Sequence, residues 1–322
     1  MSLLNQLQES SFLKINRSPD FDHFRSIEEL CEARSIPVDC KGFAASFASL
    51  RLKSCSVYLQ QTFPRILQAR YHVTGAMVAF PMNDAASLTL NGVTSSERTL
   101  IFVKGRVACE IFEPQSNLFG VVHVDCIEDR GWPGEADSAR LIAIQPALME
   151  ALQALTLKVL TLASQSPALL LQPQMIECIE ESLLQAVDLA MASASPLCEG
   201  KGLSLTHYLT LVRKFDDFLA ANAGKTVYSA DVARQLGVSV RTLHNAVVAI
   251  RGMSMHRYTR LRRLWDVRQR LVRMPPPQSI RAVALLNGFW HMGEFAALYR
   301  ELFGQSPQQS LASVRKQADD LS

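Results

Sequence analysis

The chain has 322 residues, of which 48% are hydrophobic and 20% are charged, and its formal net charge is +3. This composition is typical of a globular protein of about two domains, and it excludes a disordered, collagen-like or coiled-coil chain. The N-terminal residues lack a basic segment followed by an apolar run, and no stretch reaches about 18 uninterrupted apolar residues. We therefore expect neither a signal peptide nor a membrane span.

Seven cysteines are scattered along the chain, and no two have CxxC spacing. An odd number without paired spacing argues against a disulfide framework and against a structural zinc site. The cysteines therefore predict reduced thiols and a cytoplasmic protein.

The small net charge hides an uneven distribution. Residues 206–322 carry a net charge of +9, whereas residues 1–205 carry −6. Ten arginines and one acid, Asp266, lie between Arg234 and Arg273. Because the guanidinium group matches phosphate and guanine edges, this pattern favours a nucleic-acid partner. The alternatives are a solvated helix face and an acidic protein partner.

In chain order, the first expected element is a helix over residues 21–34, which Pro37 must end. Residues 54–125 then change to short runs rich in Val, Ile, Thr and aromatics, such as CSVYLQQ, AMVAFPM and FGVVHVD. Strands at roughly ten-residue spacing predict an antiparallel barrel or sandwich. The expected turns are at Thr74-Gly75, Asn83-Asp84, Asn91-Gly92, Lys104-Gly105 and Pro114 to Asn117.

Residues 131–137 are predicted to form a linker, after which the apolar period becomes helical. One helix is expected over residues 147–163 and a second after Pro173. Two adjacent amphipathic helices with few charges are more typical of a dimer face or of domain packing than of a ligand site. Residues 193–206 are predicted to form a second, flexible linker.

Residues 229–250 (SADVARQLGVSVRTLHNAVVAI) have the pattern of a helix-turn-helix. Ser229 is expected to cap the first helix and Ser239 the second. Gly237 lies where the chain must turn, and glycine tolerates the left-handed conformation at little cost.

A second unit repeats the first at an offset of 51 residues, because Ala284 and Gly288 correspond to Ala233 and Gly237. Ser279 is expected to cap its first helix. A long basic helix is predicted between the units over residues 254–274, and the prolines at 275–277 end it. A fixed connecting helix would place two recognition helices about one turn of DNA apart.

Arg241, His244 and Asn245 share one face of the first recognition helix, where arginine can read guanine and asparagine adenine. The second recognition helix offers His291 and Glu294, of which the carboxylate can accept from cytosine. Phosphate contacts are expected from Ser239, Thr242, Arg251, Arg257, Arg262 and Arg300. The first unit should therefore carry most base specificity, and the second should mainly anchor.

Residues 206–316 resemble the C-terminal domain of AraC/XylS-type transcription regulators. The resemblance is carried by ADVARQLGVSVRTLH, by GMSMHRYTRLRRLWDVRQRL and by SIRAVALLNGFWHMGEFAALYRELFGQSP. It implies a bacterial regulator that contacts promoter DNA in two successive major grooves. It also implies an N-terminal effector or dimerisation domain, which is often cupin-like, and RNA polymerase as a partner.

The sequence departs from the family pattern at three places. Ser310 replaces the usual tyrosine after the SP proline, which should loosen the C-terminal cap. Val267 replaces a usual alanine in the connecting helix, and the second recognition helix has little capacity for hydrogen bonds. Trp265 and Trp290 are both expected in the core.

The front half carries no HxH, HExxH or GxSxG motif and no glycine-rich phosphate loop. We therefore expect no catalytic residue, no metal and no cofactor. Four strand-borne cations in an acidic region are candidates to bind an anionic effector, such as a carboxylate metabolite or a nucleotide second messenger. They are Arg65, Arg70, Lys104 and Arg106. The alternative is that they are outward-facing, solubilising charges.

The sequence thus predicts an α+β chain in three regions. These are an effector-sensing antiparallel β-barrel or cupin-like domain with flanking helices (1–140), a helical dimerisation or linker region (141–205), and an all-α double helix-turn-helix domain (206–322). The expected partners are promoter DNA, a small-molecule effector, a second copy of the chain and RNA polymerase. The alternative is a ligand-binding protein or cupin-like enzyme with a basic, DNA-associating tail.

Overall fold

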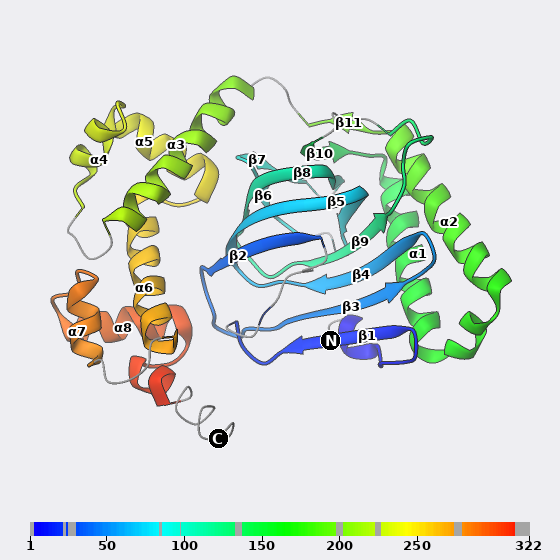
Figure 1. Cartoon of the computed structure of the whole chain (residues 1–322), viewed down its shortest axis with the longest axis horizontal. Coiled ribbons are helices and arrows are strands. Elements are labelled where there is room, and N and C mark those ends of the chain that lie inside the picture. Colours follow the sequence, from blue (N-terminus) through cyan, green and yellow to red (C-terminus); the bar gives the residue numbers. More distant parts are fainter. Residues whose placement is uncertain are drawn as a thin grey trace. The chain divides into compact units, whose positions relative to one another are not determined.

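The computed structural model describes residues 3–21, 24, 30–83, 86–96, 98–132, 137–197, 202–222, 227–273 and 279–312. The chain forms two compact units (Figure 1). Unit 1 comprises residues 1–35 and 43–200, and unit 2 comprises residues 36–42 and 201–322. Residues 141–200 of the predicted dimerisation region therefore belong to unit 1.

Unit 1 is built on one antiparallel sheet with the principal strand order β1-β3-β4-β9-β5-β8-β10-β11. Beside this path, β2 pairs with β5, and β6 pairs with β7 and β8. Because β1 and β11 lie at opposite ends of the order, the described sheet is not closed, and the predicted barrel is wrong in this respect. The strands are β1 Leu13–Ser18, β2 Cys31–Pro37, β3 Ala45–Arg51, β4 Cys55–Gln61, β5 Arg65–Pro81, β6 Thr89–Leu90, β7 Val93–Thr94, β8 Thr99–Glu113, β9 Leu118–Val124, β10 Ser138–Ala143 and β11 Ser195–Pro196.

Two of the predicted turns are bends inside long strands. β5 and β8 run without interruption through Thr74-Gly75 and Lys104-Gly105, and their register shifts between Val73 and Ala76. Gly75 has a φ of +73°, and a Cβ there would lie 2.0 Å from the Val124 carbonyl oxygen. Glycine is therefore required for the close approach of two backbones rather than for a hairpin. Asn91-Gly92 does form the predicted tight turn, between β6 and β7.

The helix predicted over residues 21–34 is wrong where the structure describes it, because residues 31–34 belong to β2. That strand pairs with β5 and buries Cys31 and Ile36. Pairing across the sheet has overridden a weak local helix signal. Residues 22–23 and 25–29 of the predicted helix lie outside the described residues, and so does Asp84 of the predicted Asn83-Asp84 turn. The same holds for residues 133–136 and 198–201 of the two predicted linkers.

Two helices pack with the sheet in the core of unit 1, α1 Pro146–Gln165 and α2 Pro173–Ala192, and both were predicted. Short 3-10 turns, Leu3–Gln6 and Pro167–Leu171, accompany them. By length and composition α1 alone among the described helices could cross a membrane, with 39% of its apolar window buried. Its buried side chains, such as Leu152 and Leu160, belong to the same core as the sheet.

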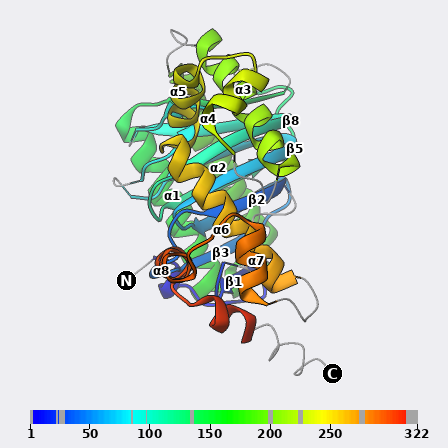
Figure 2. The ribbon, with the colours of Figure 1, turned by 90° about the vertical axis from the view of Figure 1, so that its left-hand side faces the viewer.

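Unit 2 is all helical in its C-terminal part, with two helix pairs joined by a long helix (Figure 2). The predicted turns hold, because Gly237 and Gly288 have φ values of +68° and +80°. The N-cap of α4 is Tyr228, not the predicted Ser229, and residues 274–278 after α6 lie outside the described residues. The helices are α3 Gly202–Ala221, α4 Ser229–Gln235, α5 Val240–Arg251, α6 Met255–Arg273, α7 Ile280–Leu286 and α8 Met292–Phe303.

Candidate functional site

The first recognition helix, α5, is fixed at its start and open on its outer face. Ser239 Oγ accepts a hydrogen bond from the Thr242 amide at 3.0 Å and lies 2.8 Å from its hydroxyl oxygen, which confirms the predicted cap. Leu243, Ala246 and Val247 are buried beneath the helix. Arg241, His244 and Asn245 are all exposed. The helix therefore presents a cation, an imidazole and an amide together to an outside partner.

A buried ionic cluster joins the first helix-turn-helix pair to the helices α3 and α6. Asp216 of α3 accepts from Arg251 at 2.6 Å and from Arg262 at 3.3 Å, and the Tyr258 hydroxyl also donates to it. Burial, the largest cause, raises the pKa of Tyr258 to about 12. One carboxylate thus joins α3, α5 and α6.

This cluster corrects two of the predicted phosphate contacts. Arg251 and Arg262 are buried, and both guanidinium groups are bound to Asp216 inside the fold. Neither can reach a phosphate without breaking a buried ion pair. Arg257 and Arg300 are exposed, whereas Thr242 is half-buried in the cap, so these residues and Ser239 stay predicted backbone contacts.

The second recognition helix, α8, has a different start and a different support. His291 is its N-cap and makes no side-chain cap hydrogen bond, while His291 and Glu294 are both exposed. The buried Ser310 hydroxyl accepts from Arg268 and from the Tyr299 hydroxyl, each at 2.9 Å. Ser310 therefore ties the C-terminal turn to α6 and α8 instead of loosening it.

The two tryptophans of this unit differ in burial. Trp265 is 7% exposed, as predicted, but Trp290 is 69% exposed in the turn before α8, so its predicted place in the core is wrong. Tyr228 is 66% exposed at the start of α4. Sequence reasoning missed both surface aromatics, although their positions at the edges of a turn and a helix were signals against burial.

The four cations proposed for an effector do not converge. Arg65 is buried, and its Nε donates to Glu113 Oε1 at 2.7 Å. Arg70 lies five residues along the same strand, on the opposite face, and is exposed. Lys104 is half-buried and Arg106 exposed, beyond Arg70 on the neighbouring strand. The hypothesis of one anion site made by all four is therefore wrong.

A small cavity of about 60 Å³ lies beside the Arg65–Glu113 pair within unit 1. Its wall is mostly apolar, but the Tyr71 side chain reaches it, and no described residue bonds the hydroxyl. Burial raises the pKa of Tyr71 well above its usual value, so the phenol stays protonated. Burial also raises the pKa of the neighbouring Cys31 thiol to about 11. The cavity thus offers a largely apolar space, with the Tyr71 hydroxyl and the Gln60 amide as neutral hydrogen-bonding groups in its lining.

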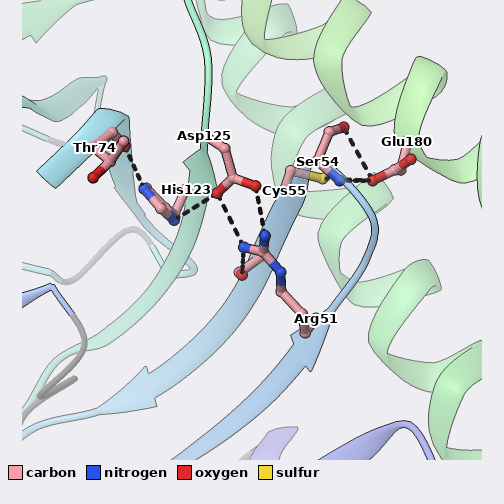
Figure 3. A network of polar contacts seen from close by, with 8 residues as sticks. Arg51, Ser54, Cys55, Thr74, His123, Asp125 and Glu180 are labelled. Carbon is pink, nitrogen blue, oxygen red and sulfur yellow. Dashed lines mark hydrogen bonds and ion pairs between the residues drawn. The ribbon is translucent and has the colours of Figure 1, made fainter.

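Figure 3 shows a polar network where the ends of β3, β4 and β9 meet α2. Arg51 donates to both oxygens of Asp125, at 3.0 and 2.5 Å, and His123 Nδ1 lies 3.6 Å from the same carboxylate. His123 Nε2 lies 2.7 Å from the Thr74 carbonyl oxygen at the β5 bulge. This network fastens the bulge to the neighbouring strands.

The same region contains a buried cysteine, Cys55. Ser54 donates to Glu180 of α2 through its amide at 2.6 Å and through its hydroxyl at 3.1 Å, with Cys55 Sγ 4.0 Å away from that carboxylate. Burial, and then Glu180, raise the pKa of Cys55 to about 12. A thiol that stays protonated is a poor nucleophile. Among the described residues, no group of three or more His, Cys, Asp or Glu could hold a metal ion, and six cysteines form no disulfide.

Comparison with known proteins gives matches to the C-terminal part. Residues 232–313 match a family described as "Helix-turn-helix domain". The probable thc operon regulatory protein of Rhodococcus erythropolis is 35% identical over 105 residues, which is 32% of each chain. The XylDLEGF operon transcriptional activator of Pseudomonas putida is 30% identical over 103 residues, 31% of this chain and 32% of that protein. The chain thus spans about a third of the length of these relatives.

Among solved structures, the AraC-like transcriptional activator CuxR is similar over 79% of this chain and 94% of that chain. The sequence identity is 14% and the TM-score 0.41. The C-terminal module of the chain is a helix-turn-helix domain. The resemblance to AraC/XylS regulators is confirmed for this module by the operon regulators that match it.

Proposed function

We propose that the protein is a transcription regulator that binds promoter DNA through unit 2 and responds to a small molecule bound in unit 1. The exposed face of Arg241, His244 and Asn245 on a capped recognition helix is the observation that carries this proposal. The matches of the same module to operon regulators support it. We further propose a cytoplasmic homodimer that pairs through α1 and α2 and acts on RNA polymerase.

The cavity beside Tyr71 is our proposed effector site. Because the Arg65 guanidinium is already paired with Glu113, its charge is neutralised and does not favour an anionic ligand in the cavity. An uncharged, largely apolar molecule that hydrogen-bonds the Tyr71 hydroxyl suits this wall. The cavity of about 60 Å³ must widen to hold more than a few water-sized groups.

Selection of genomic fragments by the full-length protein, near physiological salt, tests the DNA-binding function. We expect recovery of a defined site with two half-sites about one helical turn apart. Arg241→Ala should weaken binding by about 1–3 kcal/mol and relax the preference at one base pair. Arg270→Ala on α6 is the matched control and should leave the preference unchanged.

Recovery of random DNA with binding that disappears as salt rises would contradict the proposal. It would favour the alternative, a ligand-binding protein or enzyme with a DNA-associating tail, because non-specific binding depends almost wholly on phosphate contacts.

A further inference from the structure

A groove of about 340 Å³ lies within unit 2, apart from the outer face of α5. It is bounded by the start of α4, the first half of α6 and the turn that leads into α8. Two exposed aromatic side chains line it, Tyr228 of the first helix pair and Trp290 of the second. Large aromatic surface left open to solvent on a folded protein commonly marks a binding surface.

The groove is basic as well as aromatic. Arg260 and Arg263 of α6 line it, and neither forms an ion pair within the described part of the chain. Arg263 lies against the turn of the second pair, because a Cβ at Gly288 would be 3.6 Å from its guanidinium. Burial lowers the pKa of Arg263 from its usual value, as expected for a cation held without a counter-ion. Glu294 is the one acidic side chain in this lining.

The groove is continuous with the predicted DNA-reading surface. His291 and Glu294, at the start of the second recognition helix, form one end of it. Its other end is the start of α4, which belongs to the first helix pair. If both recognition helices lie in major grooves of one duplex, the DNA backbone between those grooves must therefore cross the space between the two helices.

We propose that this groove binds the sugar–phosphate backbone of DNA between the two recognition helices, with the arginines on phosphates and Trp290 and Tyr228 against deoxyribose. The inference rests on the proposed function and adds a third contact region to it. Such contacts fix the register of a protein on the duplex without reading bases. These contacts would hold the second helix-turn-helix pair firmly on the DNA, even though α8 has little capacity to read bases.

Tryptophan fluorescence gives a direct test, since the chain has three tryptophans and the other two, Trp132 and Trp265, are 9% and 7% exposed. We expect acrylamide to quench Trp290 strongly in the free full-length protein. A duplex of about 40 base pairs, taken from the selected genomic fragments, should remove most of this quenching. Trp290→Phe should lack the quenchable component from the start. Unchanged quenching in a stoichiometric complex would overturn the proposal.

Affinity and its salt dependence give the second test with the same duplex. Trp290→Ala should weaken binding about tenfold at constant salt slope, because the lost contact is apolar. Arg260→Gln should reduce the slope of log K against log salt by about 0.9, the value for one phosphate. Leu286→Ala, at another exposed apolar residue of the unit, and Arg270→Gln lie outside the groove and should bind as the wild type does.

The outcomes separate this inference from the proposed function. Wild-type affinity and slope in Trp290→Ala and Arg260→Gln, with specificity still lost in Arg241→Ala, would refute the groove and leave the regulator in place. Failure of the wild-type protein to select any defined site would refute the regulator itself.

Discussion

The first recognition helix begins with a serine that accepts the amide of Thr242, and it exposes a cation, an imidazole and an amide. The second begins at His291 without a side-chain cap and exposes a carboxylate near its start. The two helices follow turns of the same kind, with glycines of positive φ at Gly237 and Gly288. The shared positions therefore specify the backbone, and the residues that differ decide which groups each recognition helix exposes.

The interiors of the two helix-turn-helix pairs of unit 2 also differ. The first is held by one carboxylate, Asp216, bound to two buried arginines. The second uses the hydroxyl groups of Tyr299 and Ser310 around Arg268. A buried charge is costly to leave unpaired, whereas a lost hydroxyl contact costs less. Substitution of Asp216 should thus destabilise the first helix-turn-helix pair more than substitution of Ser310 destabilises the second pair.

The largest effect should come from Asp216→Asn. The change leaves Arg251 and Arg262 charged in the interior, so we expect the free energy of unfolding of unit 2 to fall by about 3–5 kcal/mol. Denaturant unfolding followed by helical circular dichroism would measure it. The control is Asp217→Asn, which changes the adjacent, exposed acid. If both variants lost the same free energy of unfolding, the buried charge cluster would not contribute more to stability than a surface charge does.

Ser310→Ala removes the buried hydroxyl that accepts from Arg268 and Tyr299 in the second helix-turn-helix pair. The guanidinium of Arg268 and the hydroxyl of Tyr299 each lose one partner, and we expect a loss of about 1–3 kcal/mol in the same unfolding measurement. Since the substitution removes no charge, a loss as large as that of Asp216→Asn would erase the distinction between the two interiors.

Two serine caps provide a matched pair, because Ser239 accepts the Thr242 amide and Ser279 accepts the Ala282 amide, both at 3.0 Å. Each serine-to-alanine variant should lower the free energy of unfolding by about 1 kcal/mol. Only Ser239→Ala should also change the base preference of the protein, because only that cap starts a recognition helix. A change of preference in Ser279→Ala, seen by repeating the fragment selection, would contradict this assignment.

Glu294→Ala should have the smallest effect. Removal of this exposed acid from a basic surface should change DNA affinity by less than about threefold, since an exposed charge contributes little. The selected base at a single position should become less defined if the carboxylate accepts from cytosine. A loss of affinity matching that of Arg241→Ala would show that the second unit reads bases as strongly as the first.

The helix-turn-helix units could be predicted because their signals are local. The turn glycines and the serine caps lie within a few residues of the helices they shape, and Ser239 and Ser279 act as predicted. The long strands could not be predicted in the same way. Glycine with positive φ serves both a hairpin turn and a bulge, and only pairing across the sheet decides between them, as at Gly75.

The arginines show where the prediction of the site failed. Composition counts every arginine of the basic segment alike, but Arg251 lies four residues after Val247 on the buried stripe of α5. Arg262 follows the buried Tyr258 at the same spacing on α6. That periodicity was the signal that these cations point inward and need partners. The identity of the partner, Asp216 in a helix outside the motif, depends on tertiary packing.

The position of Asp216 on α3 has a consequence for where the chain can be cut. The family match begins at residue 232, so a fragment designed from it would keep both turns and discard the carboxylate that neutralises Arg251 and Arg262. Such a fragment would be a recognisable motif without being an autonomous folding unit. A fragment that keeps this carboxylate has to include Asp216 and the helix that carries it, α3, which starts at Gly202.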